Sequence, residues 1–396
     1  MSTERQNRWE AEKMQTMPFS GIRKVSEAAA KLKAKGTDVV EMTMGRPDFD
    51  TPEHIKEAAV KALKEGKVHY TSNYGIPELR EAIAEKMKRH NGLEYDPDGE
   101  IMVTVGAAEA IFATMSSFLD PGDEIIIPAP VWVNYVAVPA SFGAKVVTVP
   151  LREENEFSLD ARDVEKAVSE KTKMIVLVTP GNPTGGVIKE KDLKEIAELA
   201  KKHDLLVIAD EVYEYLVYDG ERHVSIGKLE GMKERTIVVN SVSKTYSMTG
   251  WRIGWICADR PLMLSILRAH QYMVACAVSF AQYGAWAALK GPQDCVREMT
   301  EEFDRRRKYI VSAVNSMDKM SCITPKGAFY VFANIKKTGL TSEEASRFLL
   351  DEAHVAAVPG SAFGKEGEGF VRFAYSTSME EIKKAMERID KALRKL

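Results

Sequence analysis

The chain contains 396 residues, with 55 Lys and Arg against 58 Asp and Glu, a formal net charge of −3 and a hydrophobic fraction of 45%. This length allows a large buried core in two or three domains, so neither a disulfide nor a metal is needed to stabilise the fold. The near balance of charge argues against a protein whose main role is to bind nucleic acids or acidic surfaces.

Nothing in the sequence indicates export or a metal centre. The four cysteines are far apart and form neither a Cys-x-x-Cys pair nor a cluster with His, so we expect a reduced, cytoplasmic protein without a metal site. Residues 1–15 lack the apolar run of a secretory signal. The uncharged run at 272–289 is short for a membrane span and rich in alanine, which favours a buried helix or a subunit contact.

Apolar, β-branched runs of strand length recur through the middle of the chain, separated by segments of helical period such as 190–203. The runs lie at 101–105, 124–128, 145–149, 173–179, 205–209 and 236–240. Strands that alternate with helices predict parallel β-α-β units. Because the runs are continuously apolar, helices should cover both faces of the resulting sheet.

The pattern changes after Pro292. A long charged helical segment at 297–317 is followed by short predicted strands at 330–335, 354–359 and 370–375, with helices between and after them. This part of the chain therefore predicts a smaller α+β lobe, with a boundary near residue 290.

Polar and ionisable residues follow three of the predicted strands. A turn, Pro-Gly-Asn-Pro-Thr-Gly-Gly, begins at Pro180 at the end of the strand at 173–179. The residues after the strands at 205–209 and 236–240 include Asp210, Glu211, Ser241, Ser243 and Lys244. Ligands of open α/β sheets bind outside the carboxyl ends of the strands, so these exits predict one common site.

A phosphate pocket and a lysine nucleophile are indicated at the same edge. Gly106, Ala107 and Ala108 precede a helical segment, and free N–H groups at a helix N-terminus bind phosphate readily. No Ser/His/Asp arrangement or metal cluster accompanies them, so Lys244 remains as the candidate nucleophile. Arg252 follows Lys244 in the chain. A lysine buried near cations has a lowered pKa that suits attack on an aldehyde. These residues predict a phosphate-bearing aldehyde cofactor.

Together these motifs resemble those of the fold-type-I pyridoxal-phosphate enzymes, and most closely the class I and II aminotransferases of the aspartate and aromatic subgroup. The resemblance covers nearly the whole chain, from Gly-Arg-Pro-Asp-Phe at 45–49 and Gly-Ile-Pro-Glu-Leu-Arg at 75–80 to Pro-Gly-Ser-Ala-Phe-Gly at 359–364. It implies an α/β fold with a mostly parallel, seven-stranded central sheet covered by helices. It also implies a large cofactor domain at 51–290 and a small, discontinuous domain that joins 1–50 to 291–396.

The resemblance implies pyridoxal 5′-phosphate as the cofactor and a role for each candidate residue. Lys244 is expected to bind the cofactor aldehyde and to shuttle the substrate proton, and Asp210 to pair with the ring nitrogen. Tyr213 and Asn182 are expected to contact the phenolic oxygen, and Trp132 to stack on the ring. Each residue also has a plain structural interpretation: a surface lysine, a helix cap at Asp210, a tight turn at Asn182, or core packing of the aromatic rings.

Phosphate and substrate contacts follow from the same resemblance. The residues expected at the phosphate are Gly106, Ala107, Ala108, Ser241, Ser243 and Arg252. Tyr70 is expected to reach the phosphate from the neighbouring subunit of a homodimer. Arg372 lies on an otherwise apolar strand, where a charge is costly without a partner, and is expected to clamp the substrate α-carboxylate. Gly45, Trp132 and Asn182 are expected to contact the same substrate.

The resemblance predicts ping-pong transamination from an L-amino acid to a 2-oxo acid such as 2-oxoglutarate. A C–S β-lyase of the same fold is the alternative, because the cofactor carries the chemistry of both reactions. A cofactor-binding regulator is a remote alternative, since the segment before Gly45 is short for an added DNA-binding domain. Ala108 stands where some aspartate-type relatives have Lys, so aspartate and aromatic donors both stay open. Arg46 is either a substitute for that Lys or part of a surface ion pair.

Overall fold

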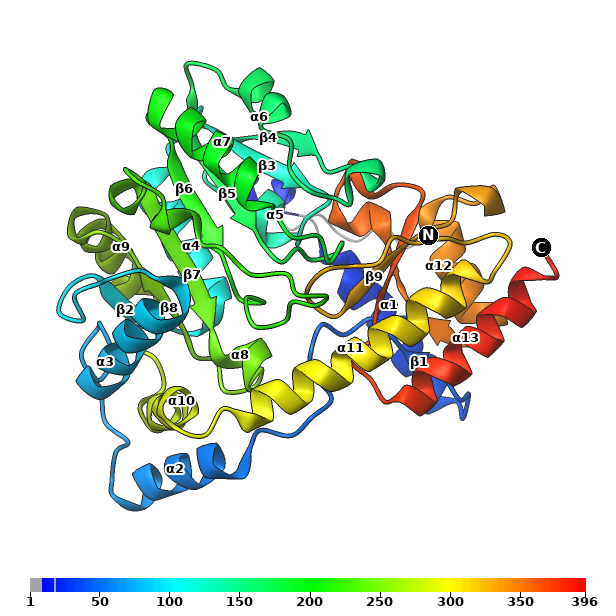
Figure 1. The fold of residues 1–396 in the computed structure, drawn as a ribbon, viewed down its shortest axis with the longest axis horizontal. Helices are drawn as coiled ribbons and strands as arrows, with labels where there is room; N and C mark the ends of the chain where they lie inside the picture. Colours follow the sequence, from blue (N-terminus) through cyan, green and yellow to red (C-terminus); the bar gives the residue numbers. More distant parts are fainter. Residues whose placement is uncertain (1–8, 18) are drawn as a thin grey trace.

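The computed structural model describes residues 9–17 and 19–396, which form a large lobe around a seven-stranded sheet and a smaller lobe beside it (Figure 1). The strand order of the sheet is β2-β8-β7-β6-β5-β3-β4. The strands are β2 (Ile101–Thr104), β3 (Glu124–Ala129), β4 (Lys145–Pro150), β5 (Thr172–Val178), β6 (Leu206–Asp210), β7 (Thr236–Ser241) and β8 (Gly254–Cys257). β8 pairs antiparallel with β2 and with β7, and all other pairs of neighbouring strands are parallel. The predicted fold class, with its mostly parallel sheet, is confirmed.

Helices cover both faces of this sheet. They are α2 (Glu53–Lys64), α3 (Pro77–Lys86), α4 (Gly106–Phe118), α5 (Asn134–Ser141), α6 (Ala161–Ala167), α7 (Glu190–Lys202), α9 (Arg260–Met273) and α10 (Ser279–Lys290). Successive residues of β5 enter opposite hydrophobic clusters: Met174 and Val176 pack with α4, α5 and α9, whereas Ile175 and Leu177 pack with α3, α7 and α10. A strand whose side chains are buried on both faces reads as a continuous apolar run.

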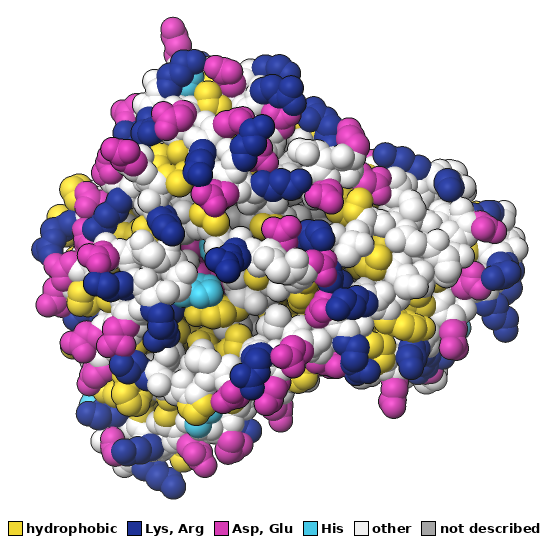
Figure 2. Space-filling model, in the orientation of Figure 1, with side chains coloured by type: hydrophobic (Ala, Val, Ile, Leu, Met, Phe, Trp, Pro, Cys, Tyr) yellow, Lys and Arg dark blue, Asp and Glu magenta, His cyan; other side chains and the backbone are white. Residues whose placement is uncertain are grey.

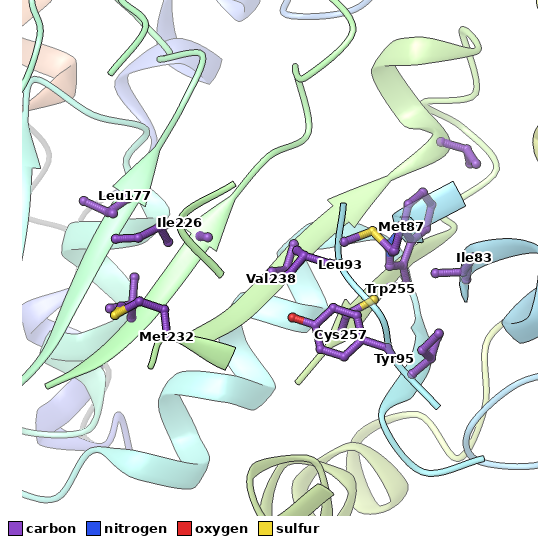
Figure 3. Close-up of a cluster of buried hydrophobic side chains, with 14 of the residues drawn as sticks. Ile83, Met87, Leu93, Tyr95, Leu177, Ile226, Met232, Val238, Trp255 and Cys257 are labelled. Carbon is purple, nitrogen blue, oxygen red and sulfur yellow. The ribbon is translucent and has the colours of Figure 1, made fainter. Parts of the chain in front are cut away.

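Figure 3 shows part of the cluster on the α3 side of the sheet, where Val238 of β7 and Trp255 of β8 lie near Met87 and Leu93. Trp255 is 1% exposed and Val238 is fully buried. Burying a large apolar side chain of this kind contributes about 1.5–3 kcal/mol. This cluster fixes β7 and β8, the two strands between which the Lys244 segment lies.

The smaller lobe combines the N-terminal segment with the C-terminal part of the chain. Its helices are α1 (Gly21–Ala34), α11 (Asp294–Asn315), α12 (Ser342–Glu352) and α13 (Met379–Leu393). Its strands are β1 (Val40–Glu41), β9 (Tyr330–Asn334), β10 (Val355–Ala356), β11 (Val358–Pro359) and β12 (Phe370–Ala374). The pairing of β1 with β10 joins the two ends of the chain. The division into 51–290 and 1–50 plus 291–396 stays a prediction.

One predicted strand of this lobe is wrong in its extent. The run at 354–359 is divided at Ala357, because the chain passes there from one sheet to another. β10 pairs in parallel with β1, whereas β11 pairs antiparallel with β12 in the sheet β11-β12-β9. An apolar run on its own does not reveal such a change of partner.

Short helical segments connect the longer elements. The 3₁₀ helices are Glu12–Thr16, Glu153–Asn155, Ile226–Lys228, Lys233–Arg235, Lys336–Thr338, Gly360–Phe363 and Lys365–Gly367. A π-helical segment, Met87–Asn91, extends α3, and the four-residue helix α8 (Val242–Thr245) follows β7. The last of these is the element that carries Lys244.

The uncharged run at 272–289 does not form one helix. It contains the end of α9, a turn, and most of α10. Ala281 and Ala285 are buried, as expected for a helix in the core, but Tyr272 is 87% exposed. Within the described residues, no helix combines the length and the apolar character that a membrane crossing requires.

The surface carries both signs of charge in close mixture. Figure 2 shows Lys and Arg side chains interspersed with Asp and Glu over most of the visible face, with small apolar areas between them. The balance of 55 basic and 58 acidic residues is therefore also a local one on this face.

Candidate active site

The predicted site residues converge where the carboxyl end of the sheet meets the smaller lobe. Lys244 Nζ donates to the carbonyl oxygen of Gly45 at 2.5 Å, and Arg372 donates to Asn182 Oδ1 at 2.9 Å. Both contacts join residues that are about 200 positions apart. The fold therefore brings together polar groups whose proximity the sequence alone does not state.

Lys244 lies in α8, whose first turn is capped by Ser241: the side-chain oxygen of Ser241 accepts from the backbone N–H of Ser243 at 2.9 Å. No described carboxylate forms an ion pair with Lys244, whose hydrogen-bond partner is the Gly45 carbonyl. Burial, reinforced by the positive charges of Arg372 and Arg252, lowers the pKa of Lys244 to about 8. About a tenth of the amine is therefore neutral and nucleophilic at pH 7, far more than for an ordinary lysine.

Asp210 is the last residue of β6 and is 4% exposed. Its carboxylate accepts a 2.6 Å hydrogen bond from the hydroxyl of Tyr135 and a 3.2 Å hydrogen bond from the backbone N–H of Val212. No cation of the described chain pairs with it. Burial raises the pKa of Asp210 to about 6, against the lowering effect of these hydrogen bonds. A buried carboxylate of this kind is ready to bind a protonated ring nitrogen.

Arg372 is 1% exposed and lies on β12 opposite Phe332. Its guanidinium is held between two aromatic rings, with Cζ 4.6 Å from the ring centre of Tyr330 and 4.8 Å from that of Phe363. It donates to Asn182 and, at 2.5 Å, to the Thr43 carbonyl, while its Nε–H has no partner among the described residues. A buried guanidinium without a carboxylate has unused donors for an anionic ligand.

Tyr213 lies in a turn after β6 rather than in a helix, so the one-turn helical spacing from Asp210 is not what positions it. Its hydroxyl is 2.7 Å from that of Tyr330. Asn182, in the turn after β5, uses its carbonyl oxygen for Arg372 and keeps its amide N–H groups for another acceptor. Both side chains therefore have donor capacity left for a ligand oxygen.

The predicted phosphate pocket lies at the N-terminus of α4. Gly106 has φ +72°, and a Cβ there would collide with the Arg252 guanidinium. Arg252 is exposed and donates to the Thr249 carbonyl at 2.9 Å. Ala107 and Ala108, half-buried, follow in the first turn of α4. The N–H groups of this turn and a guanidinium thus border one space, which suits an anion.

Ser241 has an additional structural role. Its hydroxyl donates to the Ile253 carbonyl at 3.1 Å, while its oxygen caps α8. In this arrangement its single proton is already committed to the backbone. Direct phosphate binding by Ser241 and Ser243 stays a prediction.

Trp132, Tyr70 and Arg46 make no hydrogen bond to the other predicted site residues. Trp132 packs edge-on against Tyr135 at 6.1 Å, next to the partner of Asp210. Tyr70 is 90% exposed, and neither it nor the exposed Arg46 makes a hydrogen bond or ion pair with a described residue. Within one chain, Tyr70 is therefore not joined to the site, and the surface ion pair considered for Arg46 is not seen.

The structure adds residues that the sequence reasoning missed. Tyr135 orients Asp210, Tyr330 contacts both Tyr213 and Arg372, and Phe363 covers the other face of the guanidinium. Tyr135 is the second residue of α5 and lies three positions after Trp132, which is a weak signal. Tyr330 and Phe363 occur in apolar runs and look like core residues.

A cavity of about 720 Å³ lies elsewhere, lined by His90, Tyr215 and residues of α11 among others. None of the predicted site residues lines it. Its groups lack a buried, unpaired lysine or arginine, so size alone does not make it the better candidate for catalysis.

Comparisons with known proteins agree with the resemblance found in the sequence. The family model for aminotransferase class I and II matches residues 37–389. An aspartate aminotransferase of Pyrococcus abyssi is 50% identical over 377 residues, covering 95% of this chain and 96% of that protein. An aromatic-amino-acid aminotransferase 2 of Thermococcus litoralis is 45% identical over 386 residues, covering 97% and 98%. The solved structure of the Thermus thermophilus aspartate aminotransferase with maleate has a TM-score of 0.93 at 38% identity, covering 98% of this chain and 100% of that chain.

Proposed function

Because the chain belongs to the class I and II aminotransferases and is an aminotransferase, we propose that it holds pyridoxal 5′-phosphate at the candidate active site and uses aspartate or an aromatic amino acid as donor. One observation carries this proposal. Asp210 and Arg372 are buried beside the half-buried Lys244, and none of the three forms an ion pair with a described residue. Such groups are costly unless a ligand supplies their partners.

The residues present fit the cofactor. When bound, pyridoxal phosphate supplies an electron-accepting ring that stabilises the charge left on the substrate Cα. Asp210 would hold the ring nitrogen, and Tyr213 and Asn182 would donate to the phenolic oxygen. Trp132 would cover the ring. The N–H groups of Gly106, Ala107 and Ala108, with Ser241, Ser243 and Arg252, would hold the phosphate.

Lys244 is proposed as both the covalent attachment point and the base. With its pKa lowered to about 8, its amine is a nucleophile close to neutral pH. Once released by the amino acid, the same Nζ takes the proton from the substrate Cα, and it returns a proton to that carbon in the reverse reaction. No other lysine of the described chain lies in this group of contacts.

Arg372 is proposed to orient the substrate. Its free donors bind the α-carboxylate, while the rings of Tyr330 and Phe363 keep the guanidinium in one plane. Gly45 and Asn182 lie beside it and Lys244. With the carboxylate fixed at one end, Lys244 reaches one face of the substrate, which determines which Cα bond breaks.

The identity of the donor depends on what surrounds the substrate side chain. Ala108 offers no charge to a second carboxylate, and Arg46 is exposed and unpaired among the described residues beside Gly45. Relatives named for aspartate and for aromatic amino acids match this chain at 50% and 45% identity. We therefore propose that both donors react, with Arg46 serving the distal carboxylate of aspartate.

A donor panel tests the proposal. Asp, Phe, Tyr, Ala and Met are each incubated with 2-oxoglutarate, and glutamate formation is measured. Cystathionine, which has sulfur on its β-carbon, is incubated in parallel, and the release of ammonia and pyruvate is measured. We expect glutamate from Asp and the aromatic donors. Arg46→Ala should lower kcat/KM for Asp about tenfold or more and leave Phe within about twofold, whereas Arg89→Ala, a distant exposed control, should change neither.

Two outcomes would contradict the proposal. Ammonia and pyruvate released from cystathionine, whose thiol leaves as the Cβ–S bond breaks, with no glutamate from any amino acid of the panel, would establish the C–S β-lyase, which the relatives do not favour. Equal losses for Asp and Phe in Arg46→Ala would remove Arg46 from substrate selection.

A homodimer in a cytoplasmic setting completes the proposal. The 90% exposure of Tyr70 leaves its ring available to a second copy of the chain, in which it would reach the phosphate. The four cysteines are all free thiols, which fits a reducing compartment.

A further inference from the structure

We infer that Tyr330 is a positioning residue that couples the cofactor contact Tyr213 to the carboxylate-binding Arg372. This inference rests on the proposed function, since it assigns Tyr330 a task toward residues whose roles are proposed above. Tyr330 is the first residue of β9 and is 1% exposed. Its backbone lies in the strand next to the one that carries Arg372, with Ala374 of β12 opposite it in the register.

Each part of the Tyr330 side chain contacts a different site residue. The ring face lies 4.6 Å from Cζ of Arg372, and the hydroxyl lies 2.7 Å from the hydroxyl of Tyr213. The same hydroxyl fills the space beside Gly45, where a Cβ would collide with it. Gly45 in turn supplies the carbonyl that Lys244 binds. Tyr330 thus touches residues at both proposed ends of the substrate complex.

Counting protons fixes the direction of the hydrogen bond between the two tyrosines. Each hydroxyl has a single proton, so only one of the pair donates to the other. If Tyr213 donates to a ligand oxygen, its own oxygen must accept the proton of Tyr330. Among the described residues, Tyr330 has no other hydrogen-bond acceptor for that proton. The order is therefore Tyr330 to Tyr213 to ligand oxygen, a chain in which each donor strengthens the next.

The surroundings favour this order. The charged or titratable groups facing the Tyr330 hydroxyl and ring are Arg372 from β12 and Tyr213 from the turn after β6. Lys244 of α8 lies 5.8 Å from the centre of the Tyr213 ring. Both nearby cations favour electron density on the tyrosine oxygens, and no carboxylate of the described chain bonds to either hydroxyl. The pair therefore directs one proton toward the ligand and keeps Arg372 stacked in place.

Removing the hydroxyl alone tests whether Tyr330 strengthens the hydrogen bond that Tyr213 donates. Tyr330→Phe keeps the ring and the stack on Arg372 but weakens the donation by Tyr213. The measurement is the pKa read from the visible absorbance of the pyridoxal-phosphate-loaded protein. When Tyr213 donates more weakly, more negative charge stays on the phenolic oxygen of the cofactor. That charge holds the titrating proton beside it more tightly, so the absorbance pKa should rise by about 0.3 unit or more. KM for the amino acid should stay within about threefold.

Removing the ring tests whether Tyr330 holds Arg372 in place for the carboxylate. Tyr330→Leu also takes away the aromatic face beneath Arg372, so KM for the amino acid should rise about tenfold. The matched control is Tyr375→Phe, because Tyr375 belongs to the same hydrophobic cluster, is fully buried and donates to the Ala328 carbonyl at 3.1 Å. It touches neither Tyr213 nor Arg372, so its loaded protein should keep the wild-type pKa and KM.

A double-mutant comparison decides whether Tyr330 acts through Tyr213. In a Tyr213→Phe background, Tyr330→Phe should shift the absorbance pKa by less than about 0.1 unit, since the relay is already absent. The inference is overturned if Tyr330→Phe leaves the pKa unchanged in the otherwise wild-type protein, or if the shift persists without the Tyr213 hydroxyl. Wild-type protein that takes up no pyridoxal phosphate would instead overturn the proposed function, and this inference with it.

Discussion

The buried Asp210 and Arg372 and the half-buried Lys244 lack the oppositely charged partners that are usual for ionisable groups in a protein interior. A buried ionisable group normally has an oppositely charged partner, and Lys86, at 1% exposure, has one in Glu214. The three site residues have hydrogen bonds to neutral groups instead. This contrast within one molecule separates charges that stabilise the fold from charges that await a ligand.

The lowered pKa of Lys244 predicts how cofactor uptake depends on pH. The neutral amine reacts with the aldehyde, and its pKa of about 8 lies well below the ordinary 10.5. The rate of pyridoxal-phosphate uptake by cofactor-free protein should therefore rise as pH increases from 7 and level off above about 9. Stopped-flow absorbance measures the midpoint. Arg372→Gln removes a neighbouring positive charge and should move the midpoint upward, while a wild-type midpoint near 10.5 would contradict the account.

The buried pair of Lys86 and Glu214 predicts a large effect on stability. Lys86 also donates to Asn91 at 2.8 Å, and both charged side chains are 1% exposed. Lys86→Met leaves the carboxylate of Glu214 without its cation, so the free energy of unfolding should fall by about 3–5 kcal/mol. Lys88→Met is the matched control, because the pair of Lys88 with Glu94 is 70% and 76% exposed and should be worth under about 1 kcal/mol.

Denaturant unfolding of the cofactor-free proteins measures both values. Equal losses in the two variants would mean that burial does not decide the value of an ion pair in this chain.

The sequence predicts the charged site residues better than the residues that orient them. Asp210 and Lys244 each follow an apolar strand, and a charge there stands out. Tyr330 and Tyr135 donate or accept through one hydroxyl at the end of a ring, and in the sequence they look like core aromatics. The hydrogen bonds of Tyr330 and of the Thr43 carbonyl depend on tertiary contacts between segments over 100 residues apart, which no local pattern contains.

At the scale of elements, the contact between β8 and the first turn of α4 shapes the phosphate pocket. Gly254 begins β8, and a Cβ added there would lie 2.7 Å from the carbonyl carbon of Gly106, 2.8 Å from the Ala107 nitrogen and 2.9 Å from the Asn240 oxygen. All three are backbone atoms, so relief requires the elements themselves to move. The helix N-terminus can lie this close to the sheet only because residue 254 lacks a side chain.

Gly254→Ala should therefore weaken phosphate binding specifically. We expect the affinity for pyridoxal phosphate to fall about tenfold or more, and the affinity for pyridoxal, which lacks the phosphate, to change less. Equilibrium titration of both compounds measures the ratio. Gly250→Ala is the control, since no atom lies within 4 Å of a Cβ at that position. An equal loss for both compounds would show that the pocket is distorted as a whole and not at the phosphate.

Elements with a long, uniform pattern are predictable, and short elements that change partners are not. The six apolar runs all form strands of the large sheet, and the charged helix expected at 297–317 is α11 (Asp294–Asn315). β8 has only four residues and begins with glycine, so it carries little strand signal. The two halves of the run at 354–359 belong to different sheets, which is decided by the N-terminal strand β1.

On the scale of the whole molecule, the site is assembled from both lobes. Gly45 follows β1 and Arg372 lies on β12, and these two residues of the smaller lobe bond to Lys244 and Asn182 of the larger one. The resemblance predicted this meeting of distant segments, whereas composition and charge did not. A relative movement of the lobes would therefore change the substrate and cofactor contacts together.

A second copy of the chain is required if Tyr70 reaches the phosphate of its partner. Hybrid dimers of a Tyr70→Phe chain and a Lys244→Ala chain test this. If Tyr70 crosses the interface, the site with an intact Lys244 receives an intact Tyr70, so half of the sites should regain wild-type affinity for pyridoxal phosphate. If Tyr70 acts within its own chain, no wild-type site forms, and the hybrid should show the weakened affinity of Tyr70→Phe alone.

The central claim is that Lys244 moves the substrate proton in an amino-transfer reaction that stops halfway without an acceptor. The most direct measurement is the amount and rate of 2-oxo acid released from a reactive donor by the loaded enzyme in the absence of 2-oxoglutarate. Wild-type protein should release one equivalent per chain and then stop, and Lys244→Ala should be slower by about 10²–10⁴-fold. Release that continues beyond one equivalent, or a Lys244→Ala rate within tenfold of wild type, would contradict the account.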